Sequence, residues 1–116
     1  KMEGYKNLIV WQKAKLLAIE IYKLTEQFPR TEIYGLTSQM KRAAISIPSN
    51  IAEGYRRNHD KEKIQFLAIA FGSGAELETQ IEIAKEIFKI PKLDFLKTEV
   101  LLNEIMKILN KLLASR

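Results

Sequence analysis

Cysteine is absent from this chain, and histidine occurs once, as His59. A chain without cysteine has no disulfide framework and no thiolate nucleophile, and a single histidine excludes a two-histidine metal centre. A zinc site built from cysteine and histidine is excluded for the same reason. We therefore expect no metal and no cofactor.

Glycine and proline are also scarce, with 5 and 3 residues, so few positions interrupt regular structure. No apolar run approaches the ~18 residues that a membrane-spanning helix needs, and we expect no membrane partner. The charged first residues lead into no apolar segment with a small-residue cleavage site, so we expect no signal peptide. A cysteine-free chain without an export signal is most simply cytoplasmic.

The composition suits a folded domain. Apolar residues form 47% of the 116 residues and charged residues 28%, which supports one compact domain over residues 1–116. The formal net charge is +5, from 19 Lys and Arg against 14 Asp and Glu. The excess is uneven, because residues 1–30 hold six basic side chains against three acidic ones, whereas residues 64–91 hold two against four. Basic and acidic helices can pair with each other, which leaves less charge for nucleic acid.

Apolar residues recur at spacings of three and four in four long segments, the period of an amphipathic helix. We predict helices over about Leu8–Gln27, Gly35–Arg57, residues 60–89 and Leu93–Ala114. The first helix carries one complete apolar row: Val10, Ala14, Leu17, Ile21, Leu24 and Phe28. Pro29 and Pro91 mark two connections, and long helices with short connections favour an all-α, up-down-up-down four-helix bundle.

Three local features modify these helices. Pro48 lies inside the second helix and leaves the Ala44 carbonyl without its helical donor, which predicts a kink. The run Gly72-Ser73-Gly74 lies inside the third helix, where each glycine costs roughly 1 kcal/mol relative to alanine. We predict that another backbone approaches closely there. Asn58 or Asp60 is the expected cap of the third helix.

The apolar residues exceed what one bundle needs. A core that takes three positions in seven uses roughly 38 residues over four helices of ~22 residues, whereas the chain holds 44 Val, Ile, Leu, Met, Phe, Trp and Tyr and 10 Ala. The first helix has further rows through Trp11 and Ile19, and the last helix has two rows, which begin at Leu101 and Leu102. We predict that the extra rows are buried between subunits of a homo-oligomer. The alternative is a wide face that is still internal to one bundle.

One face of the second helix is polar and of mixed chemistry. Its residues recur at spacings of three and four and combine amide, guanidinium, hydroxyl and carboxylate groups: Gln39, Arg42, Ser46, Asn50, Glu53 and Arg57. Such groups can satisfy one another's donors and acceptors, so we predict a partly buried hydrogen-bond network at a helix or subunit contact. Glu76 is the expected counter-charge of Arg42. The alternative is an ordinary solvated face.

The connection between the second and third helices is basic, with four Lys or Arg against two acids over residues 56–63. Such a turn can contact nucleic-acid phosphates, although a solvated turn is the commoner explanation. His59 lies in this turn without other ligands, so we expect it to bind no metal. The candidate nucleic-acid contacts of the chain are Lys13, Lys41, Arg42, Arg56, Arg57, Lys61 and Lys63.

No catalytic motif is visible in the sequence. It holds no P-loop, no Glu-x-x-His pair and no nucleophile and base in a known order, so we expect no catalytic residues and no enzyme. An enzyme would need a pocket near residues 72–74, lined by Arg42, Glu53 and Glu76.

Several short motifs follow one another in a fixed order over about residues 7–90. They are Val10-Trp11-Gln12-Lys13-Ala14, Phe28-Pro29, Glu32-Ile33-Tyr34-Gly35-Leu36, Gln39, Arg42-Ala43, Ser46-Ile47-Pro48-Ser49-Asn50-Ile51-Ala52-Glu53-Gly54, Phe66-Leu67, Gly72-Ser73 and Glu76-Leu77-Glu78. In this order they resemble the four-helix bundle family named for proteins encoded in intervening sequences of bacterial 23S rRNA genes. That family includes the accessory variability protein of diversity-generating retroelements. The last helix is matched by its apolar pattern alone.

The resemblance implies a bundle that assembles as a ring-shaped homopentamer. In the retroelement branch of the family, the bundle works with a reverse transcriptase and with nucleic acid. We therefore carry two hypotheses: a non-enzymatic homo-oligomeric scaffold associated with RNA, and a module that binds RNA or DNA directly through a basic surface of the ring.

Overall fold

The computed structural model describes residues 4–115, which are helical apart from short connections. The long helices are α1 (Ile9–Thr25), α2 (Leu36–Tyr55), α3 (Asp60–Ile87) and α4 (Leu96–Ala114). Single 3-10 turns form η1 (Tyr5–Asn7), η2 (Arg30–Glu32) and η3 (Lys92–Phe95). No strand occurs in this part of the chain, and the four predicted helices are confirmed. The largest difference is at the start of α4, because the residues after Pro91 form η3 first.

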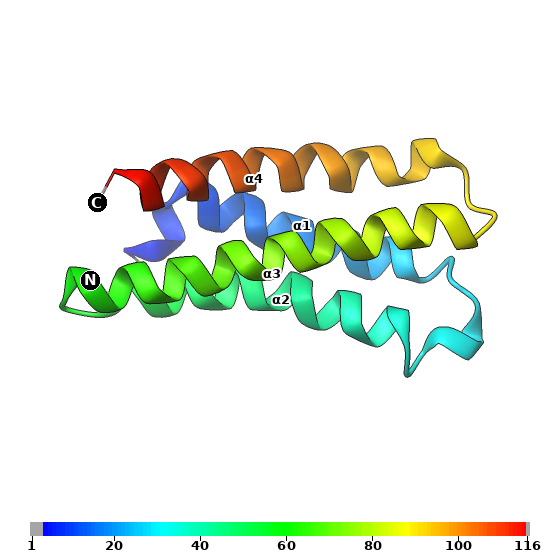
Figure 1. The fold of residues 1–116 in the computed structure, drawn as a ribbon, viewed down its shortest axis with the longest axis horizontal. Coiled ribbons are helices and arrows are strands. Elements are labelled where there is room, and N and C mark those ends of the chain that lie inside the picture. Colours follow the sequence, from blue (N-terminus) through cyan, green and yellow to red (C-terminus); the bar gives the residue numbers. More distant parts are fainter. Residues whose placement is uncertain (1–3, 116) are drawn as a thin grey trace.

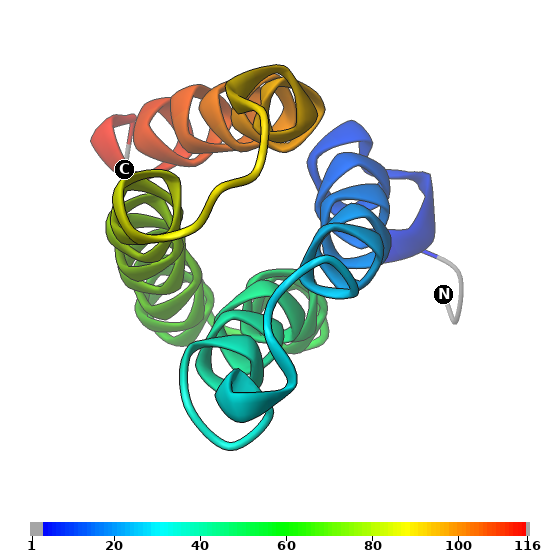
Figure 2. The ribbon, with the colours of Figure 1, turned by 90° about the vertical axis from the view of Figure 1, so that its right-hand side faces the viewer.

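The four helices run antiparallel to their neighbours in a bundle 45 Å long (Figure 1). Seen end-on, they follow one another around the core in chain order, and α4 closes the circle against α1 (Figure 2). In this arrangement α1 lies diagonally opposite α3, and the α1–α2 side lies opposite the α3–α4 side. The up-down-up-down arrangement is that of a simple antiparallel bundle.

The core is built from the predicted apolar rows. All six residues of the first row are buried: five lie in α1, starting at Val10, and Phe28 lies just after it. The rings of Phe28 and Phe88 lie 4.6 Å apart between centroids near the bundle end where η2 and η3 lie. Each large apolar side chain that is buried in this way stabilises the fold by about 1.5–3 kcal/mol.

Both apolar rows of α4 belong to this core. Leu101, Leu102, Ile105 and Leu109 are buried, and Met106, Ile108, Leu112 and Leu113 pack against the core with partial burial. The prediction that α4 keeps one of these rows for a partner is therefore wrong. The reason is geometric: α4 lies in a corner of the bundle and contacts both α1 and α3, so more than one of its faces is covered.

The glycines of α3 behave differently from the prediction. A methyl group built at Gly72 meets nothing within 4 Å, and one built at Gly74 meets the Sδ atom of Met106 at 2.2 Å. The close neighbour of Gly74 is thus a side chain of α4, and the predicted approach of a backbone is wrong. That approach occurs at Gly54, where a methyl group would lie 3.1 Å from the carbonyl oxygen of Lys63. The short turn between α2 and α3 brings their backbones together at this point.

Two further local predictions can be compared with the structure. α2 continues without a break through Pro48. The capping residue of α3 is His59, with no side-chain capping hydrogen bond, so the prediction of Asn58 or Asp60 as the cap is wrong. Asp60 and Glu62 lie in the first turn instead, where negative charge suits the positive end of the helix dipole.

None of the helices within residues 4–115 combines the length and the apolar character that crossing a bilayer requires.

Candidate interaction surfaces

The polar face of α2 contributes a small hydrogen-bond network toward α3. The hydroxyl groups of Ser46 and Ser73 are 2.8 Å apart and share a hydrogen bond. The side-chain amide of Asn50 donates to the Ser46 carbonyl oxygen at 2.8 Å and to its hydroxyl oxygen at 2.9 Å. All three side chains are partly buried. The network thus joins two helices of one subunit. Its α3 member, Ser73, lies in the glycine-containing run, and the sequence pattern does not predict its contact with Ser46.

The other predicted members of this face lie outside the network. Gln39, Arg42 and Glu76 are exposed, and in the described chain Arg42 and Glu76 form no ion pair with each other or with another residue. The predicted Arg42–Glu76 pair is therefore wrong. Glu53 instead accepts a hydrogen bond from Arg57, one turn further along the chain. The Arg57 guanidinium also lies 4.8 Å from the centroid of the Phe66 ring.

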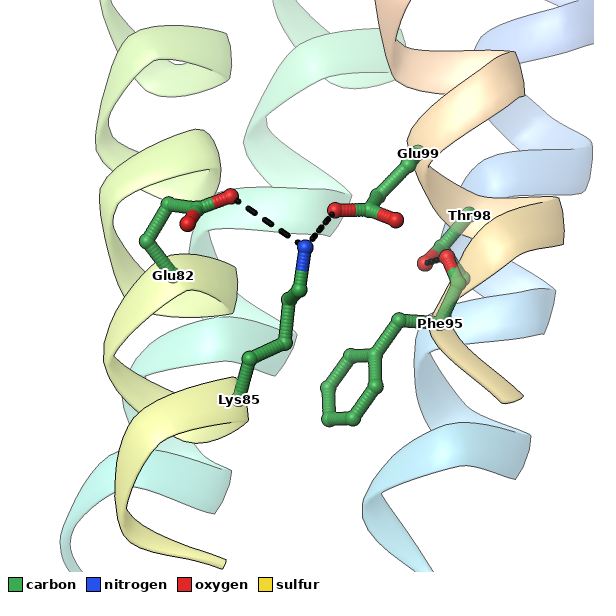
Figure 3. Close-up of polar contacts among 5 residues, drawn as sticks. All are labelled: Glu82, Lys85, Phe95, Thr98 and Glu99. Atoms are coloured by element: carbon green, nitrogen blue, oxygen red, sulfur yellow. Dashed lines mark hydrogen bonds and ion pairs between the residues drawn. The ribbon is translucent and has the colours of Figure 1, made fainter. Parts of the chain in front are cut away.

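A second polar connection, which the sequence did not suggest, joins α3 to α4. The ammonium of Lys85 donates to Glu99 at 2.7 Å and lies 3.6 Å from the carboxylate of Glu82 (Figure 3). Nearby, the hydroxyl of the buried Thr98 donates a hydrogen bond to the Phe95 carbonyl oxygen at 2.7 Å, so this buried hydroxyl has a partner at the start of α4. Residues far apart in the sequence form the bridge, so only the fold brings them together.

Two groups have raised pKa values. The hydrogen bond to Glu99, supported by the charges of Glu99 and Glu82, raises the pKa of Lys85 above the ordinary lysine value of 10.5, although partial burial opposes the shift. Burial raises the pKa of the Tyr55 hydroxyl above its ordinary value of 10.0. Both shifts lie at alkaline pH, so neither group supplies an acid or base near neutrality.

The basic residues proposed for nucleic-acid contact lie in three separate places. Lys13 is ion-paired with Glu104 of α4 at 3.1 Å. Lys41 and Arg42 lie together near the start of α2, where the Lys41 ammonium is 4.6 Å from the centroid of the Tyr22 ring. The remaining four lie around the turn between α2 and α3: Arg56, Arg57, Lys61 and Lys63.

Among the open grooves on the sides of the bundle, two differ in charge. The groove between α1 and α2, about 540 Å³, is lined by Tyr22, Ile33, Thr37, Ser38, Lys41, Arg42 and Ile45. The groove between α3 and α4, about 320 Å³, is lined by Glu78, Ile81, Glu82, Glu99, Leu102 and Asn103. The first is cationic and the second is anionic. Residues 72–74 line neither groove, and Gly74 is packed against Met106.

The acidic groove does not resemble a metal centre. Among residues 4–115, no group of three or more His, Asp or Glu side chains converges as metal ligands would.

Gln80 of α3 is buried, and its Oε1 atom accepts no hydrogen bond in the described chain. An unpaired buried acceptor costs about 1–3 kcal/mol, and no sequence pattern predicts it.

The apolar residues that exceed the needs of one bundle core lie mainly at outward-facing helix positions. On α1, Ile9, Leu16 and Ile19 are 60%, 40% and 43% exposed. They belong to the row through Ile19, which a single bundle therefore leaves exposed. Further isoleucines of α3 are exposed on its outer side: Ile69, Ile83 and Ile87.

Taken together, the fold and these surfaces define a small all-helical bundle protein whose outer sides carry apolar residues and separated charge. The sequence matches the family model of the 23S rRNA-intervening sequence protein over residues 6–111. The chain therefore belongs to this family, as its motifs predicted.

A solved structure confirms the fold. The chain is similar to a crystal structure of a protein of unknown function from the S23 ribosomal protein family of Bacteroides thetaiotaomicron. The two share 23% sequence identity with a TM-score of 0.80, over 90% of this chain and 98% of that chain. No curated protein matches this chain in sequence.

Proposed function

We propose that this protein is a non-enzymatic scaffold or accessory protein that acts as a homo-oligomer in the cytoplasm. The observation that carries the proposal is the exposed apolar row of α1: Ile9, Leu16 and Ile19. Soluble monomers rarely expose contiguous apolar patches of this kind, and their burial between subunits is favourable. The resemblance to the intervening-sequence family supports a ring-shaped homopentamer as the form of the assembly.

The test is the mass of the protein in solution. Size-exclusion chromatography with light scattering at micromolar concentration should give a multiple of the 13.4 kDa subunit mass. Replacing Leu16 and Ile19 with Glu should shift the protein to the monomer, because carboxylates cannot be buried cheaply in an apolar contact. A Leu93→Gln variant is the matched control, since Leu93 is an exposed apolar residue of η3 at the bundle end. A wild-type monomer would refute the proposal.

A second candidate function is direct binding of RNA or DNA, and the basic turn between α2 and α3 favours it. This turn lies at the same bundle end as the first helical residues of α1 and the last turn of α4 (Figure 1). Arg56 and Lys61 are exposed there, and neither takes part in an ion pair within residues 4–115. An assembly of several copies would repeat this basic end around its axis and raise the local cation density. A reverse transcriptase would be a natural protein partner of such a complex, as in the retroelement branch that this chain resembles.

Binding to a structured RNA, measured at several salt concentrations, tests this second function. Affinity should fall steeply with salt, because phosphate contacts release counterions. Arg56→Ala with Lys61→Ala should weaken binding, whereas Lys89→Ala with Lys92→Ala, which removes two exposed cations near the opposite end, should not. Equal effects of the two double variants, or binding that is indifferent to salt, would contradict a site at the turn.

A further inference from the structure

The groove between α1 and α2 combines apolar and cationic side chains. Tyr22, Ile33 and Ile45 line it with 42%, 48% and 45% of their surface exposed. Lys41 and Arg42 lie beside them, and the lining contains no carboxylate. Neither cation forms an ion pair within the described residues, and Lys41 has only the ring of Tyr22 as its counterpart. This side of the bundle therefore offers an uncompensated double positive charge next to apolar surface.

The groove between α3 and α4 has the complementary character. Glu78, Glu82 and Glu86 follow one another at spacings of four along α3, which places them in one row. Glu99 faces this row from α4, and Lys85 compensates part of the charge through its contacts with Glu82 and Glu99. Glu78 and Glu86 are exposed and belong to no ion pair in residues 4–115. Net negative charge therefore remains on this side.

The two grooves lie on opposite sides of the molecule. The order of the helices around the core places the α1–α2 side across the bundle from the α3–α4 side (Figure 2). One subunit cannot bring its own two grooves together. Two copies can do so in a head-to-tail contact, in which different patches meet: one copy keeps its acidic groove free and the other keeps its cationic groove free.

We propose that the α1–α2 groove of one copy binds the acidic α3–α4 side of the next copy. Lys41 and Arg42 would face the row of Glu78, Glu82 and Glu86, while Tyr22 and Ile45 lose their exposure. This inference rests on the proposed homo-oligomeric function and adds a second contact between copies to the one formed by the exposed row of α1. A second copy is the occupant that the charges favour, because the same chain supplies the complementary row of carboxylates. An acidic segment of another protein, or a nucleic-acid phosphate, would bind the cationic groove but would leave the row of carboxylates on α3 without a role.

Charge reversal on each side, followed by a complete swap, tests the contact. Lys41→Glu with Arg42→Glu should weaken assembly about 100-fold or more, because like charges then face each other. Glu78→Lys with Glu86→Lys should do the same from the other side and leaves the Lys85 bridge intact. The fourfold variant that carries all these substitutions should recover the wild-type mass, since the four substituted positions then again bring opposite charges together. Lys107→Glu with Lys111→Glu is the control, since these exposed cations of α4 line neither groove, and it should assemble as the wild type does.

The outcomes separate this inference from the proposed function. A monomeric wild type refutes both. A wild-type oligomer that tolerates either double reversal refutes the assigned surfaces and leaves the homo-oligomer standing. Loss of assembly in both double variants without recovery in the fourfold variant also refutes the direct contact. Loss in the Lys41/Arg42 variant alone refutes the assigned acidic row, because the cationic groove then contacts another surface of the copy. Circular dichroism reports folding of each variant, and Lys41→Gln with Arg42→Gln replaces the reversal if that variant does not fold.

Discussion

At the scale of single residues, similar glycines on helices have opposite surroundings. Gly72 of α3 is exposed, and a methyl group there meets no atom within 4 Å. Gly54 of α2 is buried against α3, where a methyl group would lie 3.1 Å from the Lys63 carbonyl oxygen and 3.2 Å from the Phe66 Cβ atom. Helix propensity favours alanine at both positions. The space beside each glycine therefore decides the sign of the effect.

We predict that Gly72→Ala raises the free energy of unfolding by up to about 1 kcal/mol, because it removes backbone freedom from the unfolded chain without a clash. Gly54→Ala should lower it by about 1 kcal/mol, because overpacking against a fixed backbone outweighs the gain in propensity. Urea unfolding of the two variants and the wild type gives both values. Stabilisation of similar size in both variants would contradict the close approach at Gly54.

At the scale of helices, the apolar period predicted the architecture because burial depends on which side of a helix a residue occupies. The row of α1 from Val10 to Phe28 is buried as the spacing indicates. The prediction that one apolar row of α4 contacts a partner is wrong. The apolar period shows that α4 has two rows, but it does not show that a corner position in the bundle covers both. Partners across helices were not predictable either. The hydrogen bonds of Ser46 with Ser73 and of Lys85 with Glu99 depend on the register between antiparallel helices, which the apolar period does not determine.

The bridge from Lys85 to Glu99 makes the α3–α4 contact sensitive to alkaline pH. The folded state holds the Lys85 proton more tightly than the unfolded chain, since its pKa is raised above 10.5. Its stabilising contribution is therefore complete below the unfolded pKa and is lost as the pH rises through the folded pKa. Tyr55, whose pKa is raised above 10.0 by burial, acts in the same direction because its ionisation is disfavoured in the folded state.

We predict that thermal stability falls as the pH rises from 9 to beyond about 10.5, the region set by the lysine and tyrosine values. Lys85→Met should reduce the slope of this fall by removing one titrating group, and Tyr55→Phe should reduce it by removing the other. Melting temperatures measured by circular dichroism across the pH range give the slopes. If a variant that combines Lys85→Met with Tyr55→Phe keeps the wild-type slope, other lysines and tyrosines account for the loss of thermal stability.

At the scale of the whole molecule, assembly and stability are linked. A single bundle covers the row from Val10 to Phe28 but leaves Ile9, Leu16 and Ile19 in contact with water. If copies cover these residues, the folded assembly is favoured by mass action over the unfolded monomer. The melting temperature of an oligomer of this kind then depends on protein concentration, whereas that of a monomer does not.

We predict that the melting temperature of the wild type rises measurably between about 1 and 100 μM protein, because association stabilises only the folded chain. The Leu16→Glu, Ile19→Glu double variant should melt at a temperature that does not change over the same range. Since both side chains are exposed on α1, the double variant should keep the helical circular dichroism spectrum of the fold. The Leu93→Gln control should retain the concentration dependence. If the wild type melts at one temperature throughout this range, the exposed row of α1 is not an interface between copies, and its apolar surface must be explained within a stable monomer.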